Sequence, residues 1–227
     1  REGQWRVPVA AVEGFESGDG QAPPGRRGRP RIEAHRARLV DRLLANDEPG
    51  AWTVVEGAQL AGLDATAVHL DLLAPAMRTI GERWARGEVS VADEHRATAV
   101  ATRLVGRLGP QFVRRGRRRG TVVVGGAPGD HHALPVALLA DVLRGSQYAV
   151  VDLGAATPVE SFVDAVRSAD DPVAVCVSLS VADLEDAAAD VVRAVHEAAD
   201  VPVLVGGPGC AGPEHAARLG AAGTATD

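Results

Sequence analysis

The chain has 227 residues, of which 46% are hydrophobic and 24% charged, an ordinary globular composition that excludes wholesale disorder. Aromatic residues make up only 3%, so the core has to be built from Ala, Val and Leu. The formal net charge is -6, so the chain as a whole is not a general nucleic-acid binder. No apolar run approaches the roughly 20 residues of a membrane span, and the start at Arg1 shows no signal peptide. Cys176 and Cys210 form no CxxC motif, and we expect a cytoplasmic protein with no membrane partner.

The first 31 residues divide into two pieces of different composition. Residues 1–16 are short and apolar and begin without a Met, so we expect a fragment of a longer protein. Residues 17–31 are rich in Gly, Pro and Arg and predict a linker. Its RGRP run, with Arg27 and Arg29, matches the core of an AT-hook, which binds in the minor groove of A·T-rich DNA. Linkers of this composition also produce such a run by chance.

Apolar residues recur with a helical period between residues 32 and 112. The pattern predicts four helices, at about 32–44, 52–61, 64–84 and 90–108. Asp64 is expected to cap the third helix, and Ser90 with Asp93 forms a capping box at the start of the fourth. Four helices joined by short loops predict a bundle.

The period changes after the arginine-rich run at 113–120, which we interpret as a solvated interdomain loop, with phosphate contact as the alternative. Continuous apolar strands then alternate with helices over 121–227, which predicts a doubly wound parallel sheet. The expected strands are 121–126, 148–154, 173–178, 201–207 and a short fifth at 223–225. The expected helices are 133–145, 159–167, 182–199 and 213–219. Ligands bind such sheets outside the carboxyl ends of the strands.

The loop after the first predicted strand contains Asp130, His131 and His132. An imidazole that coordinates a metal usually donates its other N–H to a carboxylate, and Asp130 can accept that bond from His132. One imidazole does not make a protein-only metal site. A prosthetic metal that brings its own equatorial ligands needs only one. The alternative is an ordinary helix start, with Asp130 as N-cap and the histidines in a solvated first turn.

Three features together resemble the cobalamin-binding domain, the flavodoxin-like module of methionine synthase, corrinoid proteins and mutases. They are Asp130-x-His132, Ser178 after the third predicted strand, and Gly206-Gly207 after the fourth. The resemblance implies base-off binding of cobalamin, with His132 as the lower axial ligand of cobalt and Asp130 orienting it.

The same resemblance implies a place for the nucleotide tail of cobalamin. The tail would run into the sheet toward Ser178, Ser180, Gly206 and Gly207. Two residues depart from the family pattern: Pro135 replaces a Gly of the first motif, and Ser180 replaces a Leu of the second. Both departures concern the packing of the tail more than the ligation by histidine.

A second resemblance lies in the helical region, where nine residues separate Trp84 from Glu94-His95. This spacing is similar to the Trp-x9-Glu-His signature of the CarH-type, MerR-like light-dependent repressors. It implies that Trp84, Val91, Glu94 and His95 face the upper side of adenosylcobalamin, with Trp84 against the adenosyl group. Ala85 stands where a light receptor of this type has a His, which removes that route to a second histidine ligand. A core Trp and a solvated helix face are the alternative.

These resemblances lead to one main functional hypothesis. The chain is interpreted as the cobalamin-binding sensory module of a transcription regulator and not as an enzyme. Light would cleave the Co–C bond of adenosylcobalamin held between bundle and sheet, and the oligomeric state and DNA binding would change. Residues 1–16 resemble the end of an excisionase or MerR-type helix-turn-helix domain, so DNA is an expected partner through a mostly missing domain. A homo-oligomer is expected as well.

Other functions remain open. A corrinoid carrier protein for methyl transfer shares the bundle, the sheet and the ligand histidine. A degenerate domain of this type that binds another tetrapyrrole is a further alternative. A mutase needs a substrate barrel of roughly 250 residues, for which the chain has no room.

Overall fold

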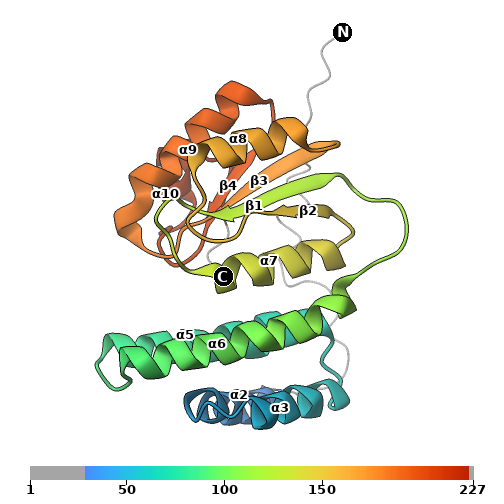
Figure 1. Cartoon of the computed structure of the whole chain (residues 1–227), viewed down its shortest axis with the longest axis vertical. Coiled ribbons are helices and arrows are strands. Elements are labelled where there is room, and N and C mark those ends of the chain that lie inside the picture. Colours follow the sequence, from blue (N-terminus) through green and yellow to red (C-terminus); the bar gives the residue numbers. More distant parts are fainter. Residues whose placement is uncertain (1–28, 225–227) are drawn as a thin grey trace.

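The computed structural model describes residues 29–224 and consists of a helical bundle stacked on an α/β domain (Figure 1). The predicted fold class is therefore confirmed in its helical N-terminal part and its parallel α/β sheet, whereas the sheet has four strands and not the five expected. Residues 1–16 and Arg27 lie outside the described residues. The predicted linker is shorter than expected at its end, because the first described helix already begins at Arg29. Among the described residues, no helix has the length and apolar character needed to cross a membrane.

The bundle follows the predicted order of helices. Its elements are α2 (Arg29–Leu44), α3 (Glu48–Leu60), α4 (Ala65–Ala67), the π-helical segment η1 (Val68–Leu73), α5 (Ala74–Ala85), α6 (Val91–Leu108) and η2 (Gly109–Phe112). Two predicted caps are confirmed: Asp64 accepts the N–H of Ala67 at 2.8 Å, and the Ser90 hydroxyl accepts that of Asp93 at 3.1 Å. The second helix starts earlier than expected, because Asp47 caps it and Pro49 is tolerated in a first turn.

A π-helical turn interrupts the predicted third helix. Pro75 has no N–H, so the carbonyl of Asp71 cannot receive the usual bond from the fourth residue along the helix. The guanidinium of Arg36 in α2 donates to that carbonyl at 2.9 Å instead. The N–H of Ala74 reaches back five residues to the carbonyl of His69. The turn that carries His69 is thereby wider than an α-helical one.

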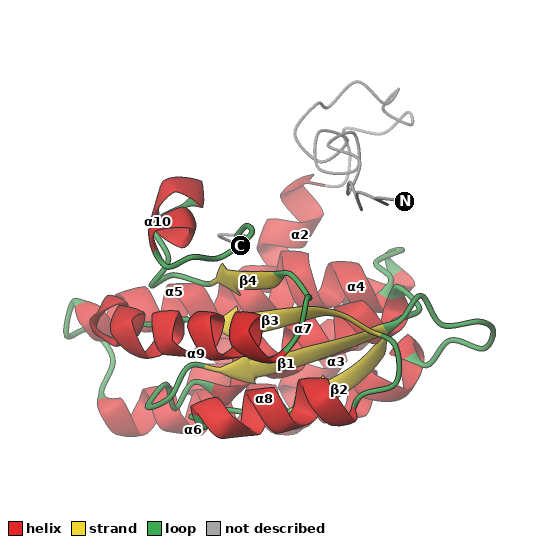
Figure 2. Ribbon diagram, turned by 90° about the horizontal axis from the view of Figure 1, so that it is seen from above, coloured by secondary structure: helices red, strands yellow, loops and turns green. Residues whose placement is uncertain are grey.

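The sheet is parallel, with strand order β2-β1-β3-β4 (Figure 2). The strands are β1 (Thr121–Gly126), β2 (Ala149–Asp152), β3 (Pro172–Ser178) and β4 (Val203–Gly206). The predicted fifth strand at 223–225 is not confirmed: Gly223 makes a single parallel bridge to Leu204, and residue 225 lies outside the described residues. Residues 220–223 are two glycines and two alanines, which have little tendency to extend as a strand.

Helices cover both faces of the sheet (Figure 1). They are α7 (Ala133–Gly145), α8 (Val159–Ser168), α9 (Glu185–Ala198), preceded by the 3-10 turn η3 (Ala182–Leu184), and α10 (Pro213–Arg218). Buried residues of α8 and α9 pack on one face together with the inward side chains of β3 and β4. Helix α7 packs on the other face, where Val136 and Ala140 contact β1.

Helix α7 belongs to both parts of the molecule. Leu134 and Leu138 are buried in the core of the bundle, whereas Val136 and Ala140 pack on Val122 and its neighbours in the sheet. The two pairs are offset by two residues, which places them on opposite sides of a helix. One helix is thus the common layer between bundle and sheet.

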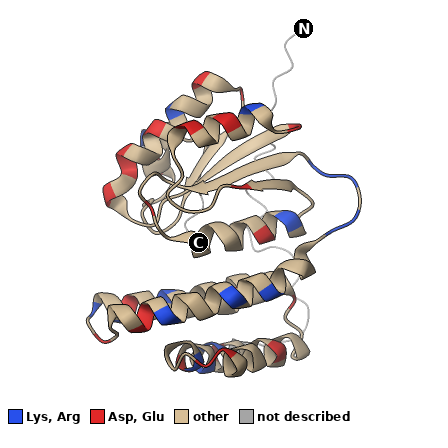
Figure 3. Ribbon diagram, in the orientation of Figure 1, with Lys and Arg blue, Asp and Glu red and all other residues tan. Residues whose placement is uncertain are grey.

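The connection between the two parts carries the arginine run. Residues 114–119 are exposed, as predicted, and form a loop at the end of the molecule where the strands begin (Figure 3). Arg119 stacks over the ring of Tyr148, with 4.7 Å from its guanidinium carbon to the ring centroid, and Arg118 reaches the carbonyl of Tyr148.

A matched pair of leucines tests this core. Leu104 in α6 is fully buried, whereas Leu60 at the end of α3 is 91% exposed. Leu104→Ala is expected to lower the free energy of unfolding by about 3 kcal/mol, because a buried cavity is left behind. Leu60→Ala is expected to change it by less than about 0.5 kcal/mol. Urea denaturation followed by circular dichroism measures both, and equal losses would contradict the assigned packing.

Candidate functional site

A buried carboxylate organises the loop after β1. Asp130 is 1% exposed, and its Oδ1 lies 2.7 Å from Nδ1 of His132 and accepts the His132 N–H at 3.1 Å. Its Oδ2 accepts the N–H of Ser180 at 2.6 Å. A carboxylate can only accept, so Nδ1 of His132 carries a hydrogen, and in the neutral imidazole Nε2 keeps its lone pair. The His132 side chain is 59% exposed, which leaves Nε2 available as a ligand.

The helix-start alternative is wrong in its details. Helix α7 begins at Ala133 with His132 in the N-cap position, and Asp130 lies outside the helix. The Asp130 side chain instead bridges the loop after β1 and the loop after β3. The structure therefore brings together Asp130, His132 and Ser180, three of the residues singled out from the sequence.

The contacts of Asp130 keep it ionised. Burial alone raises the pKa of this carboxyl, but the N–H of Ser180, the imidazole of His132 and the His132 N–H together lower it below the ordinary value of 3.8. A negative charge on Asp130 holds the His132 hydrogen at Nδ1 and increases the basicity of Nε2.

The loop after β2 holds the loop after β1, which carries His132, in place. The N–H of Ala156 donates to the carbonyl of Asp130 at 2.7 Å, and the N–H of Gly126 donates to the carbonyl of Gly154 at 2.7 Å. A Cβ on Gly126 would lie 3.2 Å from the Asp130 carbonyl oxygen, so a larger residue there would crowd this contact. Ala156 was not predicted from the sequence, because its contribution is a backbone N–H that no side-chain pattern reveals.

The predicted tail residues lie at the carboxyl ends of the central strands. Gly126, Ser178 and Gly206 are direct register partners across β1, β3 and β4. Gly207 has a φ of +113°, and a Cβ there would lie 2.7 Å from the carbonyl oxygen of Leu179. Its glycine is therefore required by the turn itself.

Beside these residues lie a buried hydroxyl and partly exposed apolar side chains. The hydroxyl oxygen of Ser180 is buried near Asp130 but lacks a hydrogen bond of normal geometry. On the α7 side of the sheet, Cys176 is only partly buried and Leu204 is 38% exposed. On the opposite side, Val175 and Val203 are fully buried. The sheet is thus incompletely covered over β3 and β4.

The predicted upper-face residues flank the turn between α5 and α6. Trp84 is 48% exposed and Val91 is 54% exposed, so Trp84 is not a core aromatic residue. Glu94 accepts from the Thr98 hydroxyl at 2.7 Å and pairs with Nδ1 of His95 at 2.7 Å. The turn lies at the same end of the molecule as the carboxyl ends of the strands (Figure 1).

Two family models match this chain. Residues 35–108 match the B12-binding_2 family model and residues 120–227 match the B12-binding model, and both are described as a B12 binding domain. The chain contains B12-binding domains. The two domains coincide with the bundle and with the α/β part, and the matches support binding of cobalamin.

Relatives of these B12-binding domains include corrinoid proteins of methanogens. Trimethylamine corrinoid protein 1 of Methanosarcina acetivorans is 27% identical over 134 residues, which cover 58% of this chain and 62% of that protein. The trimethylamine corrinoid protein of Methanosarcina barkeri is 25% identical over the same lengths. Both relatives are named as trimethylamine corrinoid proteins.

A solved structure shows the same fold. The monomethylamine corrinoid protein of Methanosarcina barkeri superposes with a TM-score of 0.73 at 19% identity, over 86% of this chain and 93% of that one. The arrangement of bundle and sheet is therefore one that these B12-binding domains share with a known corrinoid protein.

The charge on Asp130 makes a prediction about acid stability. Because its pKa is lowered on folding, the carboxylate stabilises the fold above the ordinary value of 3.8, and this contribution is lost as the pH falls through the lower, folded value. Asp130→Asn removes the titration. The stability difference between the parent and this variant is expected to shrink as the pH falls below 3.8. Urea denaturation across this range measures it, and a constant difference would refute the assignment.

Proposed function

We propose that this chain is a cobalamin-carrying module of the corrinoid carrier type, in which His132 is the lower axial ligand of cobalt. The observation that carries the proposal is the exposed Nε2 of His132, whose ring is fixed by Asp130 through Nδ1. The matches to B12 binding domains and the names of the relatives support the same conclusion. They favour the carrier over the light-responsive regulator expected from the sequence.

The residues present fit the cofactor. His132 supplies one axial ligand, which suffices because a corrin ring provides the equatorial nitrogens. Within the described part of the chain, the buried hydroxyl of Ser180 has no hydrogen bond of normal geometry, and it would donate a hydrogen bond to the nucleotide tail or accept one from it. The partly exposed side chains of Cys176 and Leu204, on the α7 side of β3 and β4, would offer apolar contact to the cofactor.

Bound cobalamin supplies a cobalt–carbon bond that can be formed and broken. The chain's own residues supply orientation and charge. Asp130, kept anionic by the Ser180 N–H, holds a hydrogen at Nδ1 of His132 and fixes the plane of the ring. Ala156 and Gly154 fix the backbone of the loop. The upper face is left to the bundle, at Trp84.

A second candidate function is an adenosylcobalamin-dependent sensor. It is favoured by the exposed Trp84 and Val91, which flank the α5–α6 turn at the cofactor end of the molecule. An aromatic side chain there would cover an adenosyl group, whereas a carrier has to admit a partner that delivers or removes methyl. DNA binding and an oligomeric switch belong to this second candidate.

The first test is ligation by histidine. The chain loaded with hydroxocobalamin is expected to show a base-off, histidine-on absorption spectrum. His132→Ala is expected to lose that spectrum and to weaken retention of the cofactor on gel filtration by at least about tenfold, since one coordinate bond is lost. The neighbouring His131→Ala is the matched control and should keep both. An unchanged spectrum in His132→Ala would refute the proposed ligand.

The second test separates carrier from sensor by the upper ligand. A carrier is expected to retain methylcobalamin at least as well as adenosylcobalamin and to respond to Trp84→Ala with less than about a threefold change in either. A sensor would prefer adenosylcobalamin by at least about tenfold and lose that preference in Trp84→Ala. Equilibrium dialysis in the dark with both cobalamins measures the ratio. A strong preference for adenosylcobalamin would overturn the carrier.

A further inference from the structure

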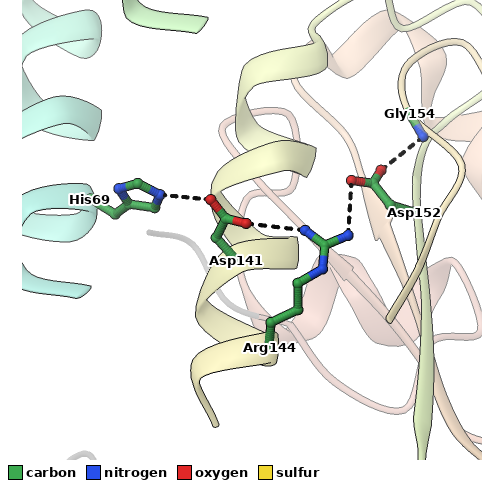
Figure 4. Close-up of polar contacts among 5 residues, drawn as sticks. All are labelled: His69, Asp141, Arg144, Asp152 and Gly154. Carbon is green, nitrogen blue, oxygen red and sulfur yellow. Dashed lines mark hydrogen bonds and ion pairs between the residues drawn. The ribbon is translucent and has the colours of Figure 1, made fainter. Parts of the chain in front are cut away.

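A buried polar pair joins the bundle to α7 (Figure 4). Nε2 of His69, in the π-helical turn of the bundle, lies 3.2 Å from Oδ2 of Asp141. The His69 side chain is fully buried and that of Asp141 is 8% exposed. The two residues are 72 positions apart in the sequence, and each comes from a different B12-binding domain.

The pair continues into the α/β domain. Oδ1 of Asp141 accepts from Arg144 at 3.1 Å, and the other end of this guanidinium lies 3.7 Å from Asp152 at the end of β2. Asp152 accepts the N–H of Gly154 at 3.1 Å. The carbonyl of Gly154 in turn receives the N–H of Gly126, immediately before the ligand loop. Figure 4 shows the polar contacts from His69 to Gly154, and the bond from Gly126 to Gly154 extends them to the start of the loop that carries His132.

The position of His69 is set by its surroundings. The widened turn caused by Pro75 carries it, and its ring lies 4.6 Å from that of Phe112, centroid to centroid. Since a carboxylate only accepts, Nε2 of His69 is the donor to Asp141. Nδ1 is buried without a partner, so this ring makes a single directional bond, and that bond points across the interface.

Directionality distinguishes this pair from the rest of the interface. Leu134 and Leu138 also bind α7 to the bundle, but apolar contacts tolerate sliding because they have no preferred angle. A buried carboxylate that loses one partner is destabilised, so displacement of the bundle along α7 has a cost that apolar packing alone would not impose. The pair therefore selects one placement of the bundle on α7.

We propose that the His69–Asp141 pair is a positioning pair. It fixes the bundle, and with it the α5–α6 turn that carries Trp84, relative to the loop after β1 that carries His132. The link to the cofactor rests on the proposed function, whereas the link between the two domains does not. When the pair is lost, the bundle samples positions away from α7, and the upper side of the cofactor site becomes more accessible.

Two variants of His69 isolate the directional bond. His69→Phe keeps the aromatic contact with Phe112 and removes the donor, and His69→Gln keeps an N–H donor. Val55, in α3, is buried in the bundle core, so Val55→Ala creates a cavity there and is the control for a general loss of stability. The readout is amide hydrogen exchange of the cobalamin-free chain, segment by segment, with thermal unfolding for comparison.

His69→Phe is expected to speed exchange of the amides in η1 and α7 by about tenfold, while α3 changes little, because the loss is local to the interface. His69→Gln should stay within about threefold of the parent in the same segments. Val55→Ala should lower the unfolding temperature without singling out η1 and α7. If His69→Phe and Val55→Ala show the same pattern, or if His69→Gln fails to restore slow exchange, the positioning role is overturned.

The cofactor side has a separate readout. In the chain loaded with cobalamin and reduced to cob(I)alamin, alkylation by iodomethane reports access to the upper face. His69→Phe is expected to raise its rate about tenfold and to leave the histidine-on spectrum of the cob(III)alamin form unchanged. An unaltered rate would overturn the control of access. Failure of the parent chain to bind cobalamin would instead refute the proposed function, and the hydrogen-exchange result would still decide the domain contact.

Discussion

The buried carboxylate of Asp130 is the constraint on which the site depends. It accepts hydrogen bonds from the N–H of Ser180, in the loop after β3, and from the imidazole of His132, in its own loop. An ionised group at 1% exposure persists only because these donors compensate for its lost hydration. The compensation works only when the carboxyl ends of β1 and β3 are side by side, so the parallel sheet and the ligand geometry require each other.

Helix α7 transmits this geometry to the bundle. Its first residue follows His132 directly, one side of it packs on the sheet, and the other side contributes Leu134 and Leu138 to the bundle core. The proposed cofactor ligand, His132, is thus the residue from which the shared helix starts. Any rotation of α7 would move both the His132 imidazole and the two leucines that α7 contributes to the bundle core.

Much of this was predictable from sequence patterns. The helical period, the caps at Asp64 and Ser90 and the apolar strands predicted the bundle and four strands, because local burial and capping decide them. The pairing of Asp130 with His132 followed from residue type and spacing. The choice between a light-responsive sensor and a corrinoid carrier was less predictable. The residues around Trp84 fit a cofactor whose upper face is covered as well as one whose upper face is accessible, and the names of the relatives favour the carrier.

Other features depended on contacts between distant residues. The π turn requires Arg36 to satisfy a carbonyl that Pro75 leaves free, which no local pattern reveals. The bond between His69 and Asp141 spans 72 positions. The predicted fifth strand is reduced to a single bridge at Gly223, because a short run of glycine and alanine has little tendency to extend as a strand. In each case tertiary packing overrode or completed what the local sequence could specify.

The two sides of α7 also bear on how the molecule unfolds. A cut in the arginine-rich connection would separate two sequence domains but not two independent cores, because the α/β part alone would expose Leu134 and Leu138 to water. Bundle and sheet are therefore expected to unfold in one cooperative transition, since melting either removes the support of the other. The boundary between the two family models does not divide the core that α7 shares with the bundle.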